Sequence, residues 1–499
     1  MTRKLRPYDE APRRRRSLIP SAPDSAATAF LVVSVLWLVA ATGIGAYAGL
    51  QRLLPDLLEA TFTFDLGAGL TIELTRATVQ PAFVDALVFG WLTNVAFAAI
   101  FFITPRLVGR QPMTDALAIL GGGAWNVAVA AGVALLYVKG ASGTAPLAEF
   151  PLPVQGLAIL GVLAVGGAFA RAAMAARGIG YVSLAYFGLG LLALLGCVAL
   201  MAVPNAVDIG ETNALLVWAF AARAIATYWV LGAALGTFYY VVPRVARNPL
   251  YSNGLAWLAL AGWAAFAGLS AVGALVDPSV PYAVTSLGQA GTLLLLAPTF
   301  LAVANLAGTL RGRWSLLFSA GPISFAVTAF VFLTAGALLE SVGSLRSVQT
   351  LVRATEWSTG VTLIALLGGA TLAFFAFAEH AAPRLLRRGW SSGALSQAEL
   401  WTVFLGAGTA GLSMLGAGII QGSLAVQGIA SDQVDSVVLA FRVLAAGGLG
   451  LAAVGGLALL VNLFLLYSSG QPADYAVPDA GASPSGAGPE AAAAAGHAR

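Results

Sequence analysis

Long apolar runs recur along almost the whole chain and are separated by short polar segments. Each run has about 20 to 30 residues, enough for a helix to cross a hydrocarbon core of roughly 30 Å. The short alternating segments that a membrane β-barrel needs are absent. Because backbone groups inside lipid must be hydrogen-bonded within the chain, the pattern predicts an all-α membrane bundle. The expected spans are residues 27–50, 82–104, 113–138, 153–175, 180–203, 213–242, 253–276, 282–309, 315–339, 357–379, 398–422 and 437–467.

Composition agrees with a bilayer as the solvent. Of the 499 residues, 59% are hydrophobic and 10% are charged, and the mean hydropathy is +0.85. A soluble domain could not bury so much apolar surface. The pI near 9.3 comes from basic residues in short loops and not from one basic face, so nucleic acid is not an expected partner. The lone Cys197 lies within an apolar run, which excludes an intrachain disulfide and a thiolate metal cage.

The distribution of basic residues predicts the orientation, because Lys and Arg are retained on the cytoplasmic face. With the N-terminus inside, the cytoplasmic loops collect most of the arginines: Arg106, Arg110, Arg171, Arg177, Arg244, Arg247, Arg311, Arg313, Arg384, Arg387 and Arg388. The opposite loops hold few cations and many acids. We therefore expect a multi-pass protein of a prokaryotic inner (plasma) membrane with both termini in the cytoplasm. Arg outnumbers Lys 24 to 2, which is typical of GC-rich prokaryotic genomes.

Three regions are expected along the chain. Residues 1–26 form a basic cytoplasmic arm, residues 27–468 the twelve-helix transmembrane domain, and residues 469–499 a disordered cytoplasmic tail rich in Ala, Gly and Pro. The one large external segment, residues 51–80, alternates loosely in TFTFDLGAGLTIEL, which favours a short hairpin. This segment either caps a partner subunit or folds over its own bundle.

Ionisable residues deep within the spans are the first candidates for a polar site, because burying a charge in lipid is costly. Arg223 lies well inside the sixth span, and Asp85 in the second span is its candidate counter-ion. The pair is either structural or part of a ligand, ion or proton site. We expect Arg442 to reach either Asp435 or the membrane interface, and Glu340 to be a polar helix end without a further role.

Signatures of soluble enzymes are missing. The chain has no Walker loop, HExxH, CxxC, or GxSxG in a suitable context. Its two histidines cannot cooperate, because His380 falls at a helix end and His497 lies in the tail. The 58 glycines favour close packing of helices through small residues.

Several motifs with polar residues in and between the apolar spans resemble the central part of heme-copper oxidase subunit I. The cbb(3)-type, or C-family, is the nearest match. YYVVPR and NPLYS stand at the sixth cytoplasmic turn, and APTFLAVANLAGTL lies in the eighth span. QPAFVDALVFGWLTN and TEWSTGVTLIALLGG, in the second and tenth spans, are further matches. The resemblance extends over about three quarters of the chain. It implies a proton-pumping oxygen or nitric oxide reductase that holds a low-spin heme, a high-spin heme and copper through histidines.

The ligand positions that the resemblance implies carry no histidine. The second-span heme position is Phe83, and the tenth-span heme positions are Val361 and Leu363. The copper positions are Arg223, Gly273 and Ala274, and the tyrosine near them is replaced by Ala267. Five methionines and one cysteine cannot rebuild these sites, so no cofactor is predicted. A fixed arginine cation would replace part of the lost metal charge.

Three hypotheses of function follow. The first is a cofactor-free structural or regulatory subunit of a respiratory electron-transfer complex, whose partners are other membrane subunits, including a cytochrome c-type subunit. The second is a transporter or proton pathway through the vacated heme cavity, with Arg223 lining it. The third is a catalytic oxygen or nitric oxide reductase whose redox centres come from a partner. A major-facilitator transporter is disfavoured, because the loop TPRLVGRQP lacks an acidic element and there is no long central loop.

Overall fold

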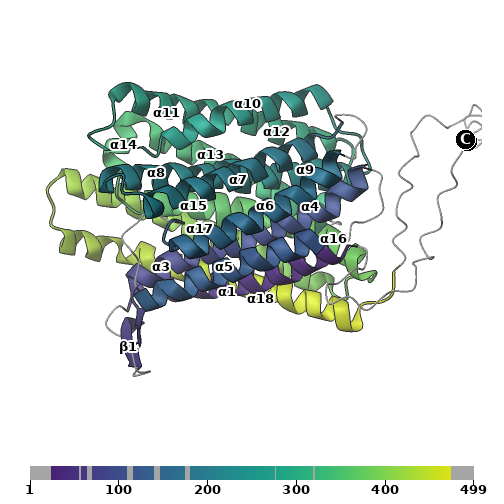
Figure 1. Ribbon diagram of the computed structural model, residues 1–499, viewed down its shortest axis with the longest axis horizontal. Helices are drawn as coiled ribbons and strands as arrows, with labels where there is room; N and C mark the ends of the chain where they lie inside the picture. Colours follow the sequence, from purple (N-terminus) through teal and green to yellow (C-terminus); the bar gives the residue numbers. More distant parts are fainter. Residues whose placement is uncertain are drawn as a thin grey trace, which may run out of the picture.

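The computed structural model describes residues 24–54, 58–64, 70–108, 116–139, 147–174, 180–275, 277–318 and 321–473. Within these residues, twelve helices are long and apolar enough to cross a membrane, as the apolar runs predict. The helices run side by side along the longest axis of the molecule (Figure 1). The expected all-α bundle is therefore confirmed. Residues 1–23 and 474–499, which contain most of the predicted arm and tail, lie outside the described residues.

Most spans are single helices. In chain order they are α1 (Ser25–Gln51), α5 (Ala116–Lys139), α6 (Leu152–Met174), α7 (Val182–Ala206), α10 (Asn253–Val272), α13 (Gly321–Ser344), α17 (Gly393–Val426) and α18 (Ser431–Ser469). A 3-10 turn, η3 (Trp314–Phe318), precedes α13, and the short helix α14 (Arg346–Val352) follows it. The ninth span thus begins later than the predicted residue 315.

The eleventh span begins earlier than predicted, at Gly393 instead of residue 398. The hydroxyl oxygen of Ser392 accepts the backbone N–H of Leu395 at 3.4 Å, which satisfies one of the free donors of the first turn. The following Ser396, Gln397 and Glu399 are polar, so apolarity alone did not mark this helix start.

Four spans are composite. The second consists of α3 (Arg76–Asp85), the π segment η1 (Ala86–Leu92) and α4 (Thr93–Val108). The sixth consists of α8 (Glu211–Ala224), η2 (Ile225–Leu231) and α9 (Gly232–Ala246), and the eighth of α11 (Tyr282–Leu294) and α12 (Leu296–Thr309). The tenth consists of α15 (Trp357–Thr362), η4 (Leu363–Ala370) and α16 (Thr371–Leu386). The three π segments lie in the spans where the family resemblance places its metal and heme ligands.

The second and tenth spans form the centre of the bundle. The most apolar window of the second span is 100% buried and that of the tenth span is 89% buried, whereas the other windows range from 33% to 56%. The outer helices therefore present much of their apolar surface to lipid, and the two central spans contact protein nearly all around.

Tryptophans in the π segments connect the central spans to one another. The indole N–H of Trp91 donates to Thr371 Oγ1 at 3.2 Å, and that of Trp229 donates to Thr93 Oγ1 at 2.9 Å. Each of these threonines also donates to a carbonyl five residues earlier, that of Leu366 or Val88, within the turn that the π geometry widens. The second span is thereby fixed to the tenth and the sixth.

A two-stranded antiparallel hairpin follows α1, as the alternating pattern predicts. Strand β1 (Ala60–Phe64) pairs with β2 (Leu70–Leu74), with Ala60 opposite Leu74. The amide of Gln51 donates to the Leu74 carbonyl at 2.9 Å and fixes the base of the hairpin to α1. The ribbon projects beyond the bundle at the lower left of Figure 1. We call this the hairpin end of the molecule and the opposite end, where α18 ends, the tail end.

Helices α17 and α18 approach each other closely through glycines. A Cβ added at Gly448 would lie 2.6 Å from the carbonyl oxygen of Gly406 and 2.6 Å from the backbone nitrogen of Ala410. At the neighbouring Gly447, a Cβ would meet nothing within 4 Å. Backbone contact of this kind is the packing that small residues allow in membranes.

We expect Gly448→Ala to destabilise the protein by about 1–3 kcal/mol, because the two helix backbones must separate. The adjacent Gly447→Ala should be neutral, since its methyl group enters open space. Unfolding of both variants in mixed detergent micelles, followed by circular dichroism, measures the difference. Equal stability of the two variants would contradict the close approach of α17 and α18.

Candidate functional site

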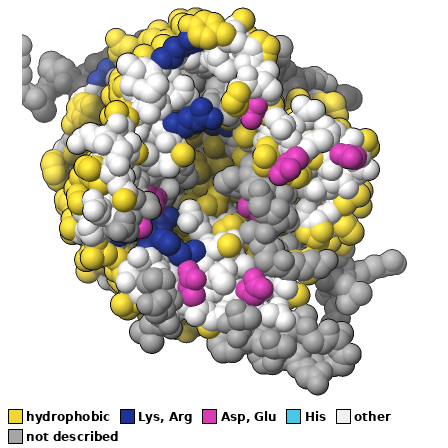
Figure 2. All heavy atoms as spheres, turned by 90° about the vertical axis from the view of Figure 1, so that its left-hand side faces the viewer, with side chains coloured by type: hydrophobic (Ala, Val, Ile, Leu, Met, Phe, Trp, Pro, Cys, Tyr) yellow, Lys and Arg dark blue, Asp and Glu magenta, His cyan; other side chains and the backbone are white. Residues whose placement is uncertain are grey.

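A polar pocket of about 820 Å³ opens at the hairpin end, between the sixth to tenth spans. In Figure 2 the face at this end is hollowed near its middle, and Lys or Arg side chains border the hollow. We call this cavity the arginine pocket. Its lining is Arg223, Ser270, Gly273, Ala274, Asp277, Pro278, Val280, Tyr282, Thr285, Gln289, Thr292, Glu340, Gly343, Ser344, Arg346, Gln349, Thr350, Val352, Arg353, Ala354, Trp357, Ser358, Val361 and Thr362.

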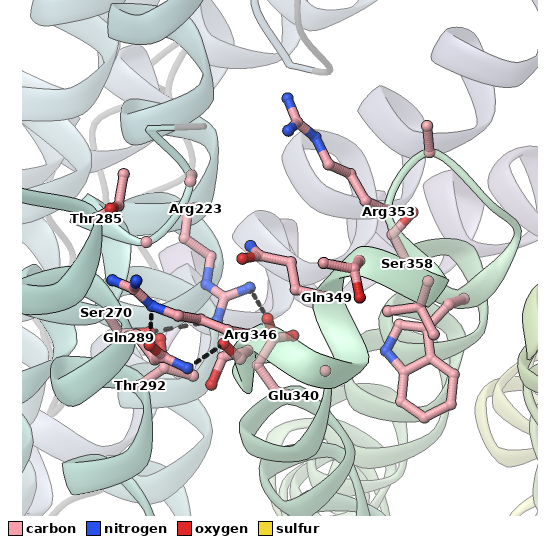
Figure 3. A pocket seen from close by; sticks show the side chains of 18 of the residues that line it. Arg223, Ser270, Thr285, Gln289, Thr292, Glu340, Arg346, Gln349, Arg353 and Ser358 are labelled. Carbon is pink, nitrogen blue, oxygen red and sulfur yellow. Dashed lines mark hydrogen bonds and ion pairs between the residues drawn. The ribbon is translucent and has the colours of Figure 1, made fainter. Parts of the chain in front are cut away.

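Arg223 lies in the inner part of the pocket, one residue before the end of α8. One terminal nitrogen of its guanidinium forms an ion pair with the carboxylate of Glu340 from α13, and the other donates to Ser270 Oγ of α10 at 3.2 Å. Thr292 of α11 donates to the same Ser270 oxygen at 3.3 Å. Four spans thus meet around one guanidinium, as Figure 3 shows. Its Nε atom is buried without a hydrogen-bond partner.

The predicted pairing of Arg223 with Asp85 is wrong. Glu340, which we expected to have no role beyond the helix end, is the counter-ion. Asp85 is fully buried at the end of α3, and neither of its carboxyl oxygens has a hydrogen-bond partner. Which helix faces neighbour one another is decided by packing across the bundle, and a single segment of the sequence does not reveal it.

A second arginine, Arg346, is held at the pocket edge by neutral groups. Its guanidinium carbon lies 3.5 Å from the centre of the Tyr282 ring, an arrangement that favours a cation–π interaction. Its Nε donates to Gln289 Oε1 at 3.3 Å, and a terminal nitrogen donates to Ser286 Oγ at 2.6 Å. These contacts fix α14 against α11. Figure 3 shows Arg346 close to Arg223, with Arg353 on the far side of the opening.

The structure brings together four of the positions that the resemblance assigned to cofactor ligands. Arg223, Gly273, Ala274 and Val361 all line the arginine pocket. Phe83 and Leu363 do not belong to it. Phe83 is 8% exposed, and its ring lies against α1, where it would be 2.7 Å from a Cβ added at Gly45. Leu363 is buried at the start of η4, and Ala267 is fully buried in α10.

Side chains fill the interior between the central spans. The Trp91 ring lies 5.8 Å from the Phe375 ring, Phe97 lies 5.5 Å from Trp229, and Phe238 lies 4.9 Å from Phe330. These contacts join the second span to the tenth and the sixth, and the sixth to the ninth. A porphyrin between these spans would have to displace buried rings. No imidazole stands at the implied ligand positions, so the residues present do not fit the two hemes and copper of the resemblance.

His380 lies at the tail end, away from the arginine pocket, as its place in the sequence predicts. It is 4% exposed between the rings of Phe102 and Tyr240, at centroid distances of 6.1 and 5.9 Å. Within the residues that the structure describes, no group of three or more His, Cys, Asp or Glu side chains is arranged to hold a metal ion.

Two buried carboxyl pairs were not singled out from the sequence. At the tail end, Glu379 and Glu399 lie near enough to interact electrostatically. Ser396 donates a hydrogen bond to Glu379 Oε1 at 2.7 Å, and Asn462 donates one to Glu399 Oε1 at 2.7 Å. At the hairpin end, Glu149 lies near enough to Asp85 to interact with it electrostatically. Burial raises the pKa of Glu149 to about 7, while backbone hydrogen bonds act in the opposite direction. Neither pair has a local sequence signal, because each forms between residues of different segments.

The fold and the arginine pocket define a multi-pass α-helical membrane protein with a polar site at one end. Residues 25–464 match the model of the family "Cytochrome C and Quinol oxidase polypeptide I". The chain belongs to this family, which confirms the resemblance to heme-copper oxidase subunit I.

Individual proteins agree with this assignment. The chain is 24% identical over 410 residues to "Cbb3-type cytochrome c oxidase subunit CcoN1" of Stutzerimonas stutzeri, covering 79% of this chain and 82% of that protein. It is 26% identical over 265 residues to "Cytochrome c oxidase subunit 1" of Rhodobacter capsulatus, covering 51% and 49%. A solved heme-copper terminal oxidase dimer has a similar fold, with a TM-score of 0.71, 14% identity, and coverage of 91% of this chain and 86% of that chain.

We expect Arg223→Leu to destabilise the protein by about 1–3 kcal/mol, because it leaves the Glu340 carboxylate without its counter-ion. The double variant Arg223→Leu with Glu340→Leu should recover part of the loss. Arg442 and Asp435 form the predicted ion pair at 2.8 Å, and the Asp435 side chain is 60% exposed. Removing that pair serves as the control and should change stability by less than about 1 kcal/mol. Additive single-variant effects at Arg223 and Glu340 would count against their coupling.

Stability should rise as the pH falls from about 8 toward 5, because the folded state holds a proton on Glu149 that the unfolded state releases. The folded pKa of Glu149, about 7, lies above the ordinary value of 4.5, so this stabilisation is lost as the pH rises through 7. Glu149→Gln should reduce the pH dependence of the thermal midpoint, whereas Glu59→Gln, at an exposed position of the same end, should preserve it. An unchanged profile in Glu149→Gln would refute the assignment.

Proposed function

We propose that the chain is a cofactor-free structural or regulatory subunit of a respiratory electron-transfer assembly. Family membership supports the respiratory assembly, since subunit I proteins of the family work within oxidase complexes. The observation that carries the cofactor-free part is the filled interior: Trp91, Trp229 and their ring partners occupy the space between the second, sixth and tenth spans. The work that remains for such a subunit is to hold partners in the membrane.

The hairpin is the element best placed to contact a partner. Its base is fixed to α1 by Gln51 and by the Tyr47 hydroxyl, which donates to the Leu58 carbonyl at 2.7 Å. Strand β2 lies against α5, and the ribbon projects past the end of the bundle (Figure 1). A two-stranded ribbon has two edges with unpaired backbone groups, which can add a strand from another chain. The geometry favours partner docking over a loop folded across its own bundle.

A solute or proton pathway across the bundle is the second hypothesis. The arginine pocket would serve as the entrance of such a pathway, but it does not extend through the bundle. The pocket is lined by residues of the hairpin end. Further along the sixth span, Trp229 and Phe238 are fully buried, and Phe238 packs on Phe330 of α13. A solute or proton chain would have to pass these apolar rings. A catalytic oxygen or nitric oxide reductase is supported least, because the ligand positions have Phe83, Val361, Leu363 and Arg223 instead of histidine.

A reduced-minus-oxidised optical spectrum with metal analysis of the purified protein tests the proposal. We expect no stoichiometric heme or copper on this chain, while cytochrome subunits that co-purify retain their own signals. The matched control is His380→Phe, which removes the one histidine among the described residues and should leave the spectrum unchanged. One or two equivalents of tetrapyrrole bound to this chain would overturn the cofactor-free assignment.

A further inference from the structure

A buried polar cluster joins the last three spans at the tail end. It consists of Glu379 from α16, Ser396 and Glu399 from α17, and Asn462 from α18. Glu379 and Ser396 are 5% and 7% exposed, and Glu399 and Asn462 are fully buried. We call these four residues the carboxyl cluster. It lies at the opposite end of the bundle from the arginine pocket, so the two sites are separate.

Hydrogen bonds connect the two acids of the cluster through neutral groups. The amide nitrogen of Asn462 donates to Glu399 Oε1 at 2.7 Å and to Ser396 Oγ at 3.3 Å. The Ser396 hydroxyl in turn donates to Glu379 Oε1 at 2.7 Å. Each carboxyl therefore accepts a hydrogen bond through one oxygen, and a continuous chain of contacts holds the two groups in fixed positions across three spans.

No basic side chain of the described residues forms an ion pair with either carboxyl. The charged group that acts on Glu399 is Glu379, which is itself an acid. Arg384 and Arg388, which follow along the chain, donate to backbone carbonyls, and His380 lies between rings of α4 and α9. Two ionised carboxylates here would be like charges in a dry interface, which is unfavourable unless a cation neutralises one of them.

Unused oxygens show where the neutralising group would bind. Glu399 Oε2 and Asn462 Oδ1 are buried without a hydrogen-bond partner. Glu379 Oε2 faces the start of α13, where a Cβ added at Gly321 would lie 2.9 Å from it. An ionised Glu399 would keep a charged oxygen away from water without any donor, which costs far more than burying a neutral carboxyl group.

A proton fits this place better than a metal ion. Glu399 and Asn462 have no exposed surface, so no water-sized space adjoins them. Calcium takes about six to eight oxygen ligands, and such a shell needs room that the cluster does not have. A proton needs no extra volume, because it binds directly to a carboxyl oxygen.

We propose that the carboxyl cluster is a proton-binding site, in which Glu379 and Glu399 hold at least one proton between them while α16, α17 and α18 are packed together. The proton comes from water at the tail end and forms an O–H bond on a carboxylate oxygen. It returns to water as the pH rises, and the like charges that remain push the spans apart. The bound proton thereby controls how the last three spans pack.

The contact that should loosen first joins the loop after α16 to the end of α18. There the Gly389 N–H donates to the Gln471 carbonyl at 2.9 Å, and the Ala473 N–H donates to the Arg387 carbonyl at 3.1 Å. Both backbone contacts depend on the distance between α16 and α18, which the carboxyl cluster fixes.

Infrared difference spectroscopy of the full chain in detergent, recorded as the pH is raised, tests the site. A protonated carboxyl group has a carbonyl band that a carboxylate lacks. We expect such a band to disappear with rising pH and to be lost or reduced in both Glu399→Gln and Glu379→Gln. Subtracting the spectrum of each variant from that of the unmodified chain separates this site from Asp85 and Glu149. Glutamine keeps the size and an acceptor oxygen of glutamate, and either variant alone suffices if the other does not fold.

Glu211→Gln is the matched control, because Glu211 is an exposed acid in the first turn of α8 and its replacement changes the net charge equally. This variant should retain the band. A spectrum without a carboxyl band, or a band that neither the pH nor the two cluster variants change, would overturn the proposal. So would a band that appears or vanishes when sodium chloride replaces choline chloride at constant pH, since the neutralising group would then be a metal ion.

Backbone hydrogen exchange tests the coupling to packing. Exchange of residues 387–396, corrected for the intrinsic rate at each pH, should increase with pH in the unmodified chain and in Glu211→Gln. It should stay constant in Glu399→Gln, where the two acids can no longer repel each other. The same pH profile in all three proteins would show that the cluster does not control the contact between α16 and α18.

Discussion

Hydrogen bonds from indoles to threonines hold the second, sixth and tenth spans at fixed separations, and the rest of the bundle packs around them. Trp91 reaches Thr371 and Trp229 reaches Thr93, each across a π-helical turn. Lipid tails are as apolar as the side chains of membrane helices, so the hydrophobic effect does not drive these helices together. Polar contacts and close packing determine how they associate. The three wide turns place these donors and acceptors where the spans cross.

The fold of this chain resembles that of a heme-copper oxidase, but its fold does not determine which side chains lie between the central spans. The backbone follows the course of heme-copper oxidases closely enough for a TM-score of 0.71, yet large rings occupy the space between the central spans. Fold similarity does not transfer chemistry, which depends on particular side chains at particular positions. The twelve spans are therefore a property of the family fold, and the chemistry of this chain depends on its own side chains.

A large open volume, the arginine pocket, lies at the hairpin end. At the hairpin end, Gly273 and Ala274 leave space at the end of α10, and the charged group of Arg223 needs polar surroundings that a packed apolar core could not supply. Glu340, Ser270 and water-accessible volume together provide them. The same packing of spans therefore produces a buried apolar centre and a polar pocket at the hairpin end. We expect the docking function of the protein to be located at this end.

The sequence by itself determined the number of the spans, the hairpin and the family, because each depends on a local pattern of apolar and polar residues. For Arg442 it left Asp435 and the membrane interface as alternatives, and the structure shows the pair with Asp435. Tertiary structure alone decided that Arg223 meets Glu340, 117 residues away. It also decided that the carboxyl oxygens of Asp85 are buried without a hydrogen-bond partner. It also decided that α14 brings Arg346 over Tyr282. Partners of buried charges depend on which helix faces touch, and that follows from packing across the whole bundle and from no single segment.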